Sequence, residues 1–283
     1  MAVPLTWMVV VSNYEPALNS ATLRPPDDDC LDSISRRLGM SNRAVRSSEH
    51  GSNQMKLPHH LETLDDPRLN ALREAIAAFE DETLSEGRLE NLEAERILLL
   101  ADQSMFDDRD GPMTVAAFTR RVSKSPDWCR FLHALTRGLA PTNVVEMGTG
   151  VGISAAAIAT ALQAGSSMWT VDLRPESGEQ ARRLLTRLGA WCFVVTGRFD
   201  EVLEQVLSEA EPVDMLFVDG HHRQLPTLRY TEQAAPHLSH RAVVVYDDIR
   251  WSEEMHLAWL EITSQERWAW SVDLGTVGVC AIR

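Results

Sequence analysis

Residues 144–154 of this chain, VVEMGTGVGIS, read as a buried strand, a glycine turn and the start of a helix. Gly148, Gly150 and Gly152 stand at alternate positions, so the backbone can turn sharply and lie against a ligand with no Cβ in the way. A turn of this kind joins a strand to a helix in open parallel sheets. The stretch therefore predicts the first strand–helix unit of an α/β fold.

From residue 142 onward, apolar runs of strand length alternate with helical stretches. Continuous apolar strands separated by helices predict a parallel sheet that is covered on both faces. Residues 273–277 are too few for a crossover helix, so the last strand is expected to run antiparallel. The predicted fold is α/β, a Rossmann-like sheet of seven mostly parallel strands with a C-terminal antiparallel hairpin strand. The expected strands are residues 143–146, 168–171, 192–196, 213–218, 242–246, 268–272 and 278–282; the helices between them are residues 153–162, 176–188, 200–209, 226–238 and 252–263.

The part of the chain before the first strand divides in two. Residues 61–140 contain stretches with helical spacing of apolar residues and are predicted to form an N-terminal helical cap. Residues 1–60 are rich in breakers and polar residues, and they are predicted to be an irregular, mobile extension. Residues 141–283 form the third predicted part, the ligand-binding domain. The expected cap helices are residues 66–81, 89–100, 115–122 and 128–139.

Composition excludes several classes of partner. The net charge is -14 and the pI about 5.1, which disfavours nucleic acid and an anionic membrane surface. The four cysteines are scattered and form no Cys-x-x-Cys pair, which argues against a zinc knuckle and for a reducing cytoplasm. Residues 1–11 are apolar but too short to span a bilayer and lack a basic segment, so we expect neither a signal peptide nor an anchor.

Glu146, at the end of the first strand, helps to identify the ligand of the glycine turn. It would repel the pyrophosphate of a dinucleotide by roughly 1 kcal/mol in water and about 4 kcal/mol at an effective dielectric of 20. It would attract S-adenosylmethionine (SAM), which carries a sulfonium and an ammonium. The spacing Gly-x-Gly-x-Gly also differs from the dinucleotide fingerprint Gly-x-Gly-x-x-Gly.

Four more residues are candidates for the same cofactor site, and one of them is Asp219 after the fourth strand, which is also a candidate catalytic residue. Asp172 ends the second strand, where a carboxylate can accept hydrogen bonds from both ribose hydroxyls. Phe199 follows the third strand and either contacts the adenine ring or packs in the core. Ser154 at the helix start either binds the carboxylate of the cofactor or caps its own helix.

A second group of acids follows the fourth and fifth strands: Asp219, Asp247 and Asp248. Converging carboxylates repel one another unless a hard cation such as Mg²⁺ is bound between them, where it could also lower the pKa of a substrate hydroxyl. The alternative is a metal-free site in which one aspartate caps a helix and another orients a base. His221 and His222 follow Asp219, and either imidazole could take the substrate proton, with His221 slightly favoured.

These motifs together resemble the class I SAM-dependent O-methyltransferases over residues 142–283. The matching stretches are residues 146–154, 171–172, 217–222 and 247–251. The spacing of the acids is similar to the catechol-type, metal-dependent branch, in which the positions of Asp219, Asp247 and Asp248 hold the metal. That branch usually has Asn at the position of Asp248, and a lysine base that this chain does not supply in the matching region. Bacterial methyltransferases with Phe-x-Asp-Gly-x-His and Asp-Asp-Ile-x-Trp motifs are more similar, and in them the helices before the first strand cover the SAM site.

The resemblance implies a cytoplasmic enzyme that transfers the methyl group of SAM to a hydroxyl of a small-molecule metabolite, with or without a divalent metal. A small-molecule N-methyltransferase and a non-catalytic SAM-binding protein stay open as alternatives. An NAD(P) reductase is disfavoured by Glu146, by the glycine spacing and by the lack of a Tyr-x-x-x-Lys pair. The expected partner is a small methyl acceptor, with no nucleic acid or membrane, and a homodimer stays open.

Overall fold

The computed structural model describes residue 55 and residues 57–81, 87–106 and 111–283. Contacts divide the chain into Met1–Val45 and Arg46–Arg283, and every described residue lies in the second unit. The predicted extension of residues 1–60 therefore falls almost entirely outside the described residues, and the division into three domains stays a prediction. None of the helices in these described ranges is long and apolar enough to cross a membrane.

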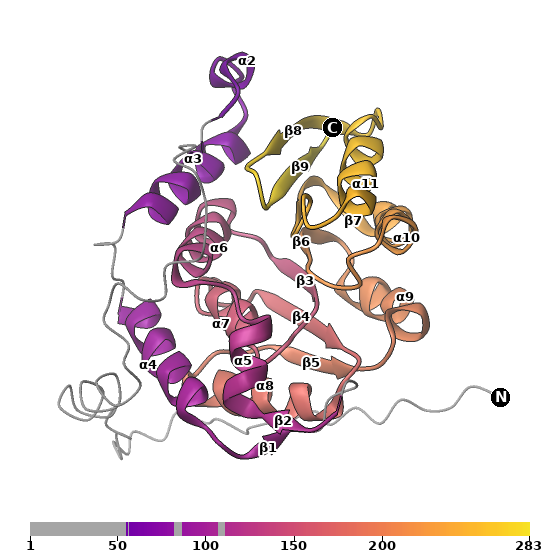
Figure 1. The fold of residues 1–283 in the computed structure, drawn as a ribbon. Helices are drawn as coiled ribbons and strands as arrows, with labels where there is room; N and C mark the ends of the chain where they lie inside the picture. Colours follow the sequence, from indigo (N-terminus) through magenta and orange to yellow (C-terminus); the bar gives the residue numbers. More distant parts are fainter. Residues whose placement is uncertain (1–54, 56, 82–86, 107–110) are drawn as a thin grey trace. The chain divides into compact units, whose positions relative to one another are not determined.

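A seven-stranded sheet organises this unit (Figure 1). Its order is β5-β4-β3-β6-β7-β9-β8; the strands from β5 to β7 are parallel, and β9 is antiparallel to both of its neighbours. The predicted architecture, including the antiparallel C-terminal strand, is confirmed. The strands are β3 (Asn143–Met147), β4 (Ser167–Asp172), β5 (Phe193–Thr196), β6 (Val213–Val218), β7 (Leu238–Tyr246), β8 (Trp268–Asp273) and β9 (Gly278–Ile282).

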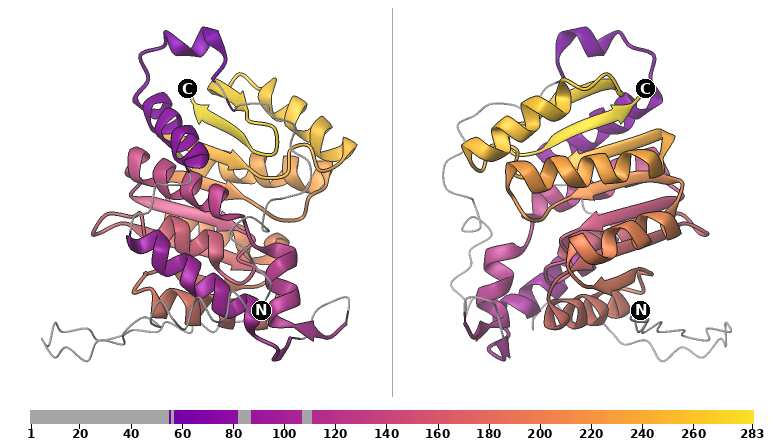
Figure 2. Two further views of the ribbon diagram at one scale, coloured as in Figure 1. Left: turned by 60° about the vertical axis from the view of Figure 1, so that its left-hand side comes forward. Right: turned by 90° about the vertical axis from the view of Figure 1, so that its right-hand side faces the viewer.

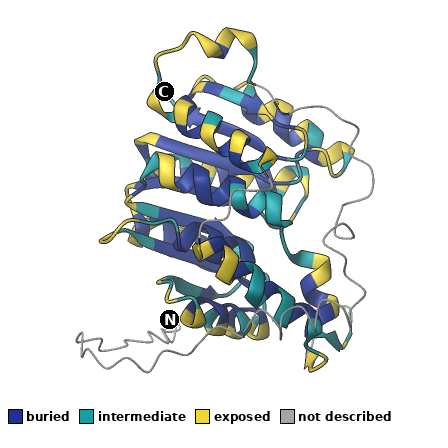
Figure 3. Cartoon of the chain, turned by 90° about the vertical axis from the view of Figure 1, so that its left-hand side faces the viewer, coloured by how far each residue is buried: buried dark blue, intermediate teal, exposed yellow. Residues whose placement is uncertain are grey.

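Helices cover both faces of the sheet (Figure 2). Successive residues of a strand point to opposite faces, so Val144 and Phe217 join one buried cluster while Val145 and Leu216 join the other. This is why the strands read as continuous apolar runs. The first cluster includes residues of α3 (Pro67–Glu80), α6 (Pro126–Leu139), α7 (Ile153–Ala159) and α8 (Pro175–Arg187); the second includes residues of α9 (Phe199–Ala210), α10 (Gln224–Ala234) and α11 (Glu253–Thr263). Figure 3 shows the buried strands and the exposed outer sides of the helices.

The predicted cap helices are present, and local capping explains where two of them begin. The Thr114 side chain accepts a hydrogen bond from Ala117 N at the start of α5 (Val115–Val122), and the Ser125 side chain accepts one from Trp128 N at the start of α6. Only residues 123–125 separate these two helices. The predicted helix at residues 89–100 is α4 (Gly87–Ala101). The short helix α2 (His59–Glu62) and a small antiparallel pair of β1 (Met105–Phe106) and β2 (Met113–Thr114) were not expected from the sequence.

The carboxyl ends of the central strands meet at one edge of the sheet. Asp219 N donates to Met147 O at 2.8 Å, and Asp247 N donates to Val218 O at 2.9 Å, so the residues that follow β6 and β7 continue the pairing of their strands. Ligands of open parallel sheets bind at this edge. The candidate residues of both predicted groups are therefore neighbours.

Candidate functional site

The glycine turn after β3 has a backbone that only glycine fits. Gly148, Gly150 and Gly152 have φ values of 109°, 51° and 91°. A Cβ on Gly148 would lie 1.9 Å from Asp219 O, and one on Gly152 would lie 2.8 Å from Ala181 Cα. A Cβ on Gly150 would lie 3.1 Å from Val122 Cγ2, so the turn is packed tightly between the end of β6, helix α8 and helix α5.

Glu146 is a fully buried carboxyl at the end of β3. Its Oε2 accepts a hydrogen bond of 2.5 Å from Thr170 Oγ1, which also lies 2.7 Å from Thr149 Oγ1. Its Oε1 has no hydrogen-bond partner in the described part of the chain. Burial raises the pKa of Glu146 to about 7, against the opposing effects of the Ser154 and Thr170 hydroxyls and of Lys124. A buried acid of this kind is stabilised when a cationic ligand binds beside it.

Asp172 holds the glycine turn against β4. Its Oδ2 accepts from Gly150 N at 3.0 Å, its Oδ1 accepts from Arg174 N at 3.0 Å, and the Arg174 guanidinium lies 3.7 Å from Oδ1. Burial raises the pKa of Asp172, and the backbone hydrogen bonds oppose the shift. The carboxylate thus already accepts hydrogen bonds from the backbone on both sides of the strand end. The predicted ribose contact is compatible with this structural role and stays a prediction.

Ser154 and Phe199, the remaining cofactor candidates, both lie at the same edge. Ser154 is buried in the first turn of α7, and its hydroxyl lowers the pKa of Glu146. Phe199 is half-buried at the start of α9 and packs edge-to-face on Tyr230, with ring centroids 5.5 Å apart. A Cβ on Gly220 would lie 2.9 Å from Phe199 Cε2, so this ring packs on the turn after β6.

The second acid group contains a lysine that sequence reasoning did not place there. Lys124 Nζ lies 3.0 Å from Asp219 Oδ2 and donates a hydrogen bond to Asp247 Oδ2. All three side chains are largely buried, with exposed fractions of 15% for Lys124, 11% for Asp219 and 2% for Asp247. The lysine belongs to the short segment between α5 and α6. The helical cap therefore supplies one residue of the site.

The charges of this group depend on one another. Burial alone lowers the pKa of Lys124, but the carboxylates of Asp219 and Asp247 outweigh burial and raise it, so the side chain stays an ammonium. Burial raises the pKa of Asp219, the Asp247 charge adds to the shift, and Lys124 opposes it. The pKa of Asp248 is raised for the same reasons, with His222 also opposing. Lys124 is thus a cation of the site and not a base near neutral pH.

The predicted magnesium ligands, Asp219, Asp247 and Asp248, do not fit a divalent cation in this arrangement. In the ranges that the structure describes, no group of three or more His, Cys, Asp or Glu side chains could hold a metal ion. An ammonium has only hydrogen-bond donors to offer, and it already contacts oxygens of two of the three predicted ligands. No step of the chemistry below is therefore assigned to a metal.

The two histidines occupy different positions. His222 Nε2 lies 3.8 Å from Asp219 Oδ1 and 3.8 Å from Asp248 Oδ2. His221 is exposed, and its Nδ1 lies 3.0 Å from Tyr230 Oη. His221 and Asp248 have left-handed backbones, with φ of 57° and 55°. Such strain in non-glycine residues gathers at functional sites, and here it aims the side chains that follow β6 and β7.

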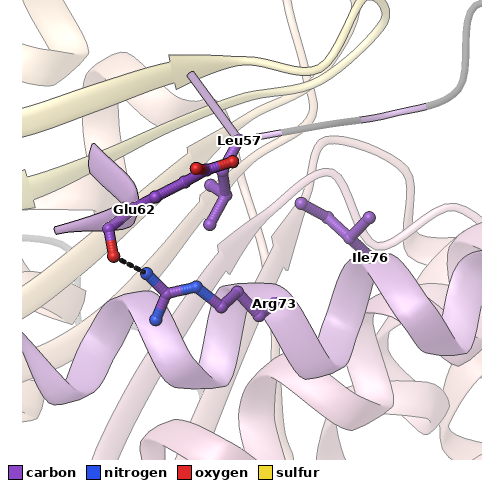
Figure 4. Close-up of a pocket in the computed structure, with 4 residues that line it drawn as sticks. All are labelled: Leu57, Glu62, Arg73 and Ile76. Carbon is purple, nitrogen blue, oxygen red and sulfur yellow. Dashed lines mark hydrogen bonds between the residues drawn. The ribbon is translucent and has the colours of Figure 1, made fainter. Parts of the chain in front are cut away.

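A hollow of about 400 Å³ lies elsewhere, in the cap. Figure 4 shows its lining residues, Leu57, Glu62, Arg73 and Ile76, with the Arg73 guanidinium donating to the backbone oxygen of Glu62 at 3.1 Å. None of these residues belongs to the strand ends. The hollow is therefore separate from the candidate site.

Comparison with known proteins agrees with this geometry. Residues 145–249 match a family described as "Methyltransferase domain". Catechol O-methyltransferase of Niastella koreensis is 32% identical over 102 residues, which are 35% of this chain and 46% of that protein. The chain thus spans about half the length of this curated relative.

Solved structures show the same fold at lower identity. An O-methyltransferase from Bacillus cereus in complex with SAH has a TM-score of 0.56 and 18% identity, over 76% of this chain and 100% of the other. O-methyltransferase TomG from Streptomyces achromogenes in complex with SAM has a TM-score of 0.54 and 18% identity, over 76% and 98%.

The solved structures thus share the fold of this chain. Within that fold, residues 145–249 are similar to the methyltransferase domain family, and the curated relative matched there is named a catechol O-methyltransferase.

Proposed function

We propose that this protein binds SAM at the glycine turn and transfers its methyl group to a hydroxyl of a small molecule. The observation that carries the proposal is Glu146, a buried acid beside the glycine turn, whose Oε1 accepts no hydrogen bond from the residues that the structure describes. A cation near this carboxyl favours its charged form, whereas a pyrophosphate would oppose it. The cofactor, when bound, supplies the electrophilic methyl.

The residues of the chain then have three tasks. The turn and Asp172 bind and orient the cofactor. The buried Glu146 supplies the acid beside the cation of the cofactor. His222, whose Nε2 lies between Asp219 and Asp248, is our candidate for the proton acceptor, because imidazole is the usual base near neutral pH. His221 is the second candidate.

Titration calorimetry with SAM, SAH and NADPH tests the cofactor. We expect SAM and SAH to bind and NADPH not to bind. The variant Glu146→Gln keeps the shape of the side chain but removes its charge, and it should weaken SAM at least about tenfold. Glu261→Gln, an exposed position on α11, is the control and should leave affinity unchanged. Binding of NADPH in place of SAM would refute the proposal.

Turnover tests the acceptor chemistry. The Niastella relative is named a catechol O-methyltransferase, so catechol is the first acceptor to try, together with small phenols and amines. His222→Ala should lower kcat by about 10²–10⁴ and leave SAM affinity within about twofold. Methylation confined to amines would favour an N-methyltransferase, and SAM binding without turnover on any acceptor would favour a non-catalytic role. The cytoplasmic location and a homodimer stay predictions.

A further inference from the structure

Lys124 is an unusual residue for this chain. The sequence contains two lysines, Lys56 and Lys124, so arginine supplies 27 − 2 = 25 of the basic residues. A lysine ammonium is a compact point charge, whereas a guanidinium is a planar fork. The acid group of the candidate site therefore contains the kind of side chain that most resembles a small metal cation.

The position of Lys124 is fixed from the cap side. Arg96, on α4, is 6% exposed and donates a hydrogen bond to Lys124 O. The same guanidinium binds Glu93 Oε2 at 2.8 Å and Cys129 Sγ at 3.1 Å, which ties the segment to both α4 and α6. Because the buried Arg96 holds the backbone oxygen of Lys124, the side chain of Lys124 is directed at the acids.

The ammonium takes the position that a divalent cation would need. It lies 3.0 Å from Asp219 Oδ2 and bonds Asp247 Oδ2, while His222 lies on the other side of Asp219 and beside Asp248. Two buried carboxylates would repel one another strongly without a positive partner. The lysine supplies that partner from within the chain.

We propose that Lys124 is the built-in cation of this site: it replaces a divalent metal between Asp219 and Asp247. This proposal concerns the protein alone and is tested without any methyl acceptor.

The test is Mn²⁺ and Mg²⁺ binding to the full chain without cofactor, measured by calorimetry and by melting temperature. The wild-type protein should show no saturable binding and no change in melting temperature with either metal. Lys124→Ala leaves three acids without their cation, so it should melt lower, bind Mn²⁺ saturably and melt several degrees higher when the metal is added. Lys124→Arg keeps a charge and should not gain metal binding.

The double variant Lys124→Ala/Asp247→Asn also removes one of the buried acids that the lysine contacts, and it should lose the acquired metal binding. If Lys124→Ala is unfolded without metal, refolding on addition of Mn²⁺ supports the proposal in the same way. Saturable metal binding by the wild-type protein that Asp247→Asn abolishes would overturn it. So would a Lys124→Ala variant whose stability and binding do not respond to metal. Neither result depends on whether the protein methylates anything, so failure of this inference is distinct from failure of the proposed function.

Discussion

At residue 148 the end of β3 approaches β6 so closely that no side chain fits. A Cβ there would lie 1.9 Å from Asp219 O, and the backbone has φ +109°. Gly165 has a similar φ of +92° but nothing within 4 Å of its Cβ position. Alanine variants at these two glycines therefore distinguish the energetic cost of a positive φ from the cost of the close approach between β3 and β6.

We expect Gly165→Ala to lower the free energy of unfolding by about 1–3 kcal/mol, the cost of a strained backbone. Gly148→Ala should lower the free energy of unfolding clearly more, because the close contact between β3 and β6 must also open. The affinity of this variant for SAM should fall as well. Urea unfolding and SAM titration of both variants measure this. Equal losses for the two variants would mean that the close approach contributes nothing.

Glu146 makes a pH-dependent contribution to stability. The pKa of its carboxyl rises from 4.5 to about 7 on folding, because burial disfavours the charged form. Below both pKa values the carboxyl is protonated in the folded and the unfolded state, so it has no net effect. As pH rises from about 4.5 to about 7, the unfolded chain releases the proton first, and the free energy of unfolding falls.

The variant Glu146→Gln removes this dependence. Its stability relative to wild type should increase through the window from about pH 4.5 to about pH 7, by up to about 3 kcal/mol in total. Denaturant unfolding of both proteins across this range gives the difference, and the exposed Glu261→Gln serves as the control. A stability difference that is constant with pH would show that the carboxyl is not buried as described.

At the scale of elements, the sequence predicted the alternation of strands and helices because the periodicity of apolar residues reports burial directly. The largest difference among the sheet strands is β7, which begins at Leu238 and not at residue 242. Its pairing with β6 is irregular between Val213 and Met215. The polar residues Ser239 and His240 lie in this stretch, and Ser239 Oγ donates to Asp214 Oδ1 at 2.7 Å. Because this first part of β7 is polar and bonds to its neighbour through a side chain, it lacks the pattern of apolar residues from which a strand is predicted.

The candidate site was predictable in part for the same reason. Strand ends and glycine turns are local patterns, so the residues that follow β3, β4, β6 and β7 were named from sequence. Lys124 was not, because it is 123 positions away from Asp247 and is brought there by the packing of the cap. From sequence alone, the acids therefore indicate either a magnesium ion or a metal-free site, and not a lysine. The scarcity of lysine in the chain was the one available signal.

Arg96 connects α4, α6 and the segment that carries Lys124. Its guanidinium bonds Lys124 O, Glu93 Oε2 and Cys129 Sγ while nearly buried. Arg96→Met should lower the free energy of unfolding by about 2 kcal/mol or more, because it removes hydrogen bonds made by a charged, buried group. Arg183→Met, which removes an exposed pair with Glu179, should cost less than about 0.5 kcal/mol.

Chemical denaturation of the two arginine variants tests this prediction. A similar small effect for both would show that the cap segment is held by packing and not by Arg96. If Arg96 does position the lysine, its loss should also weaken the Lys124–Asp219 contact, and Arg96→Met should then show part of the Mn²⁺ response expected for Lys124→Ala.

At the scale of the whole molecule, the net charge of -14 favours a cationic ligand over a neutral one. The acids at the strand ends add a local field of the same sign, and Lys124 and Arg174 offset only part of it. Such fields act over about 10 Å at about 0.1 M salt and are screened at higher salt. A protein built in this way should distinguish SAM from SAH by charge, because SAH lacks the sulfonium.

Salt titration of the two ligands measures that distinction. Raising NaCl from about 0.05 M to about 0.5 M should weaken SAM several-fold, since screening removes the long-range attraction of the acidic surface. SAH has the same adenosine and amino-acid groups, so its affinity should change less over the same range. Glu146→Gln should bring the salt dependence of SAM closer to that of SAH, because it removes an acidic charge beside the glycine turn. Identical salt dependence of SAM and SAH in the wild-type protein would contradict this prediction. The site would then recognise the cofactor by shape and hydrogen bonds alone, and the acids would interact only with Lys124 and His222.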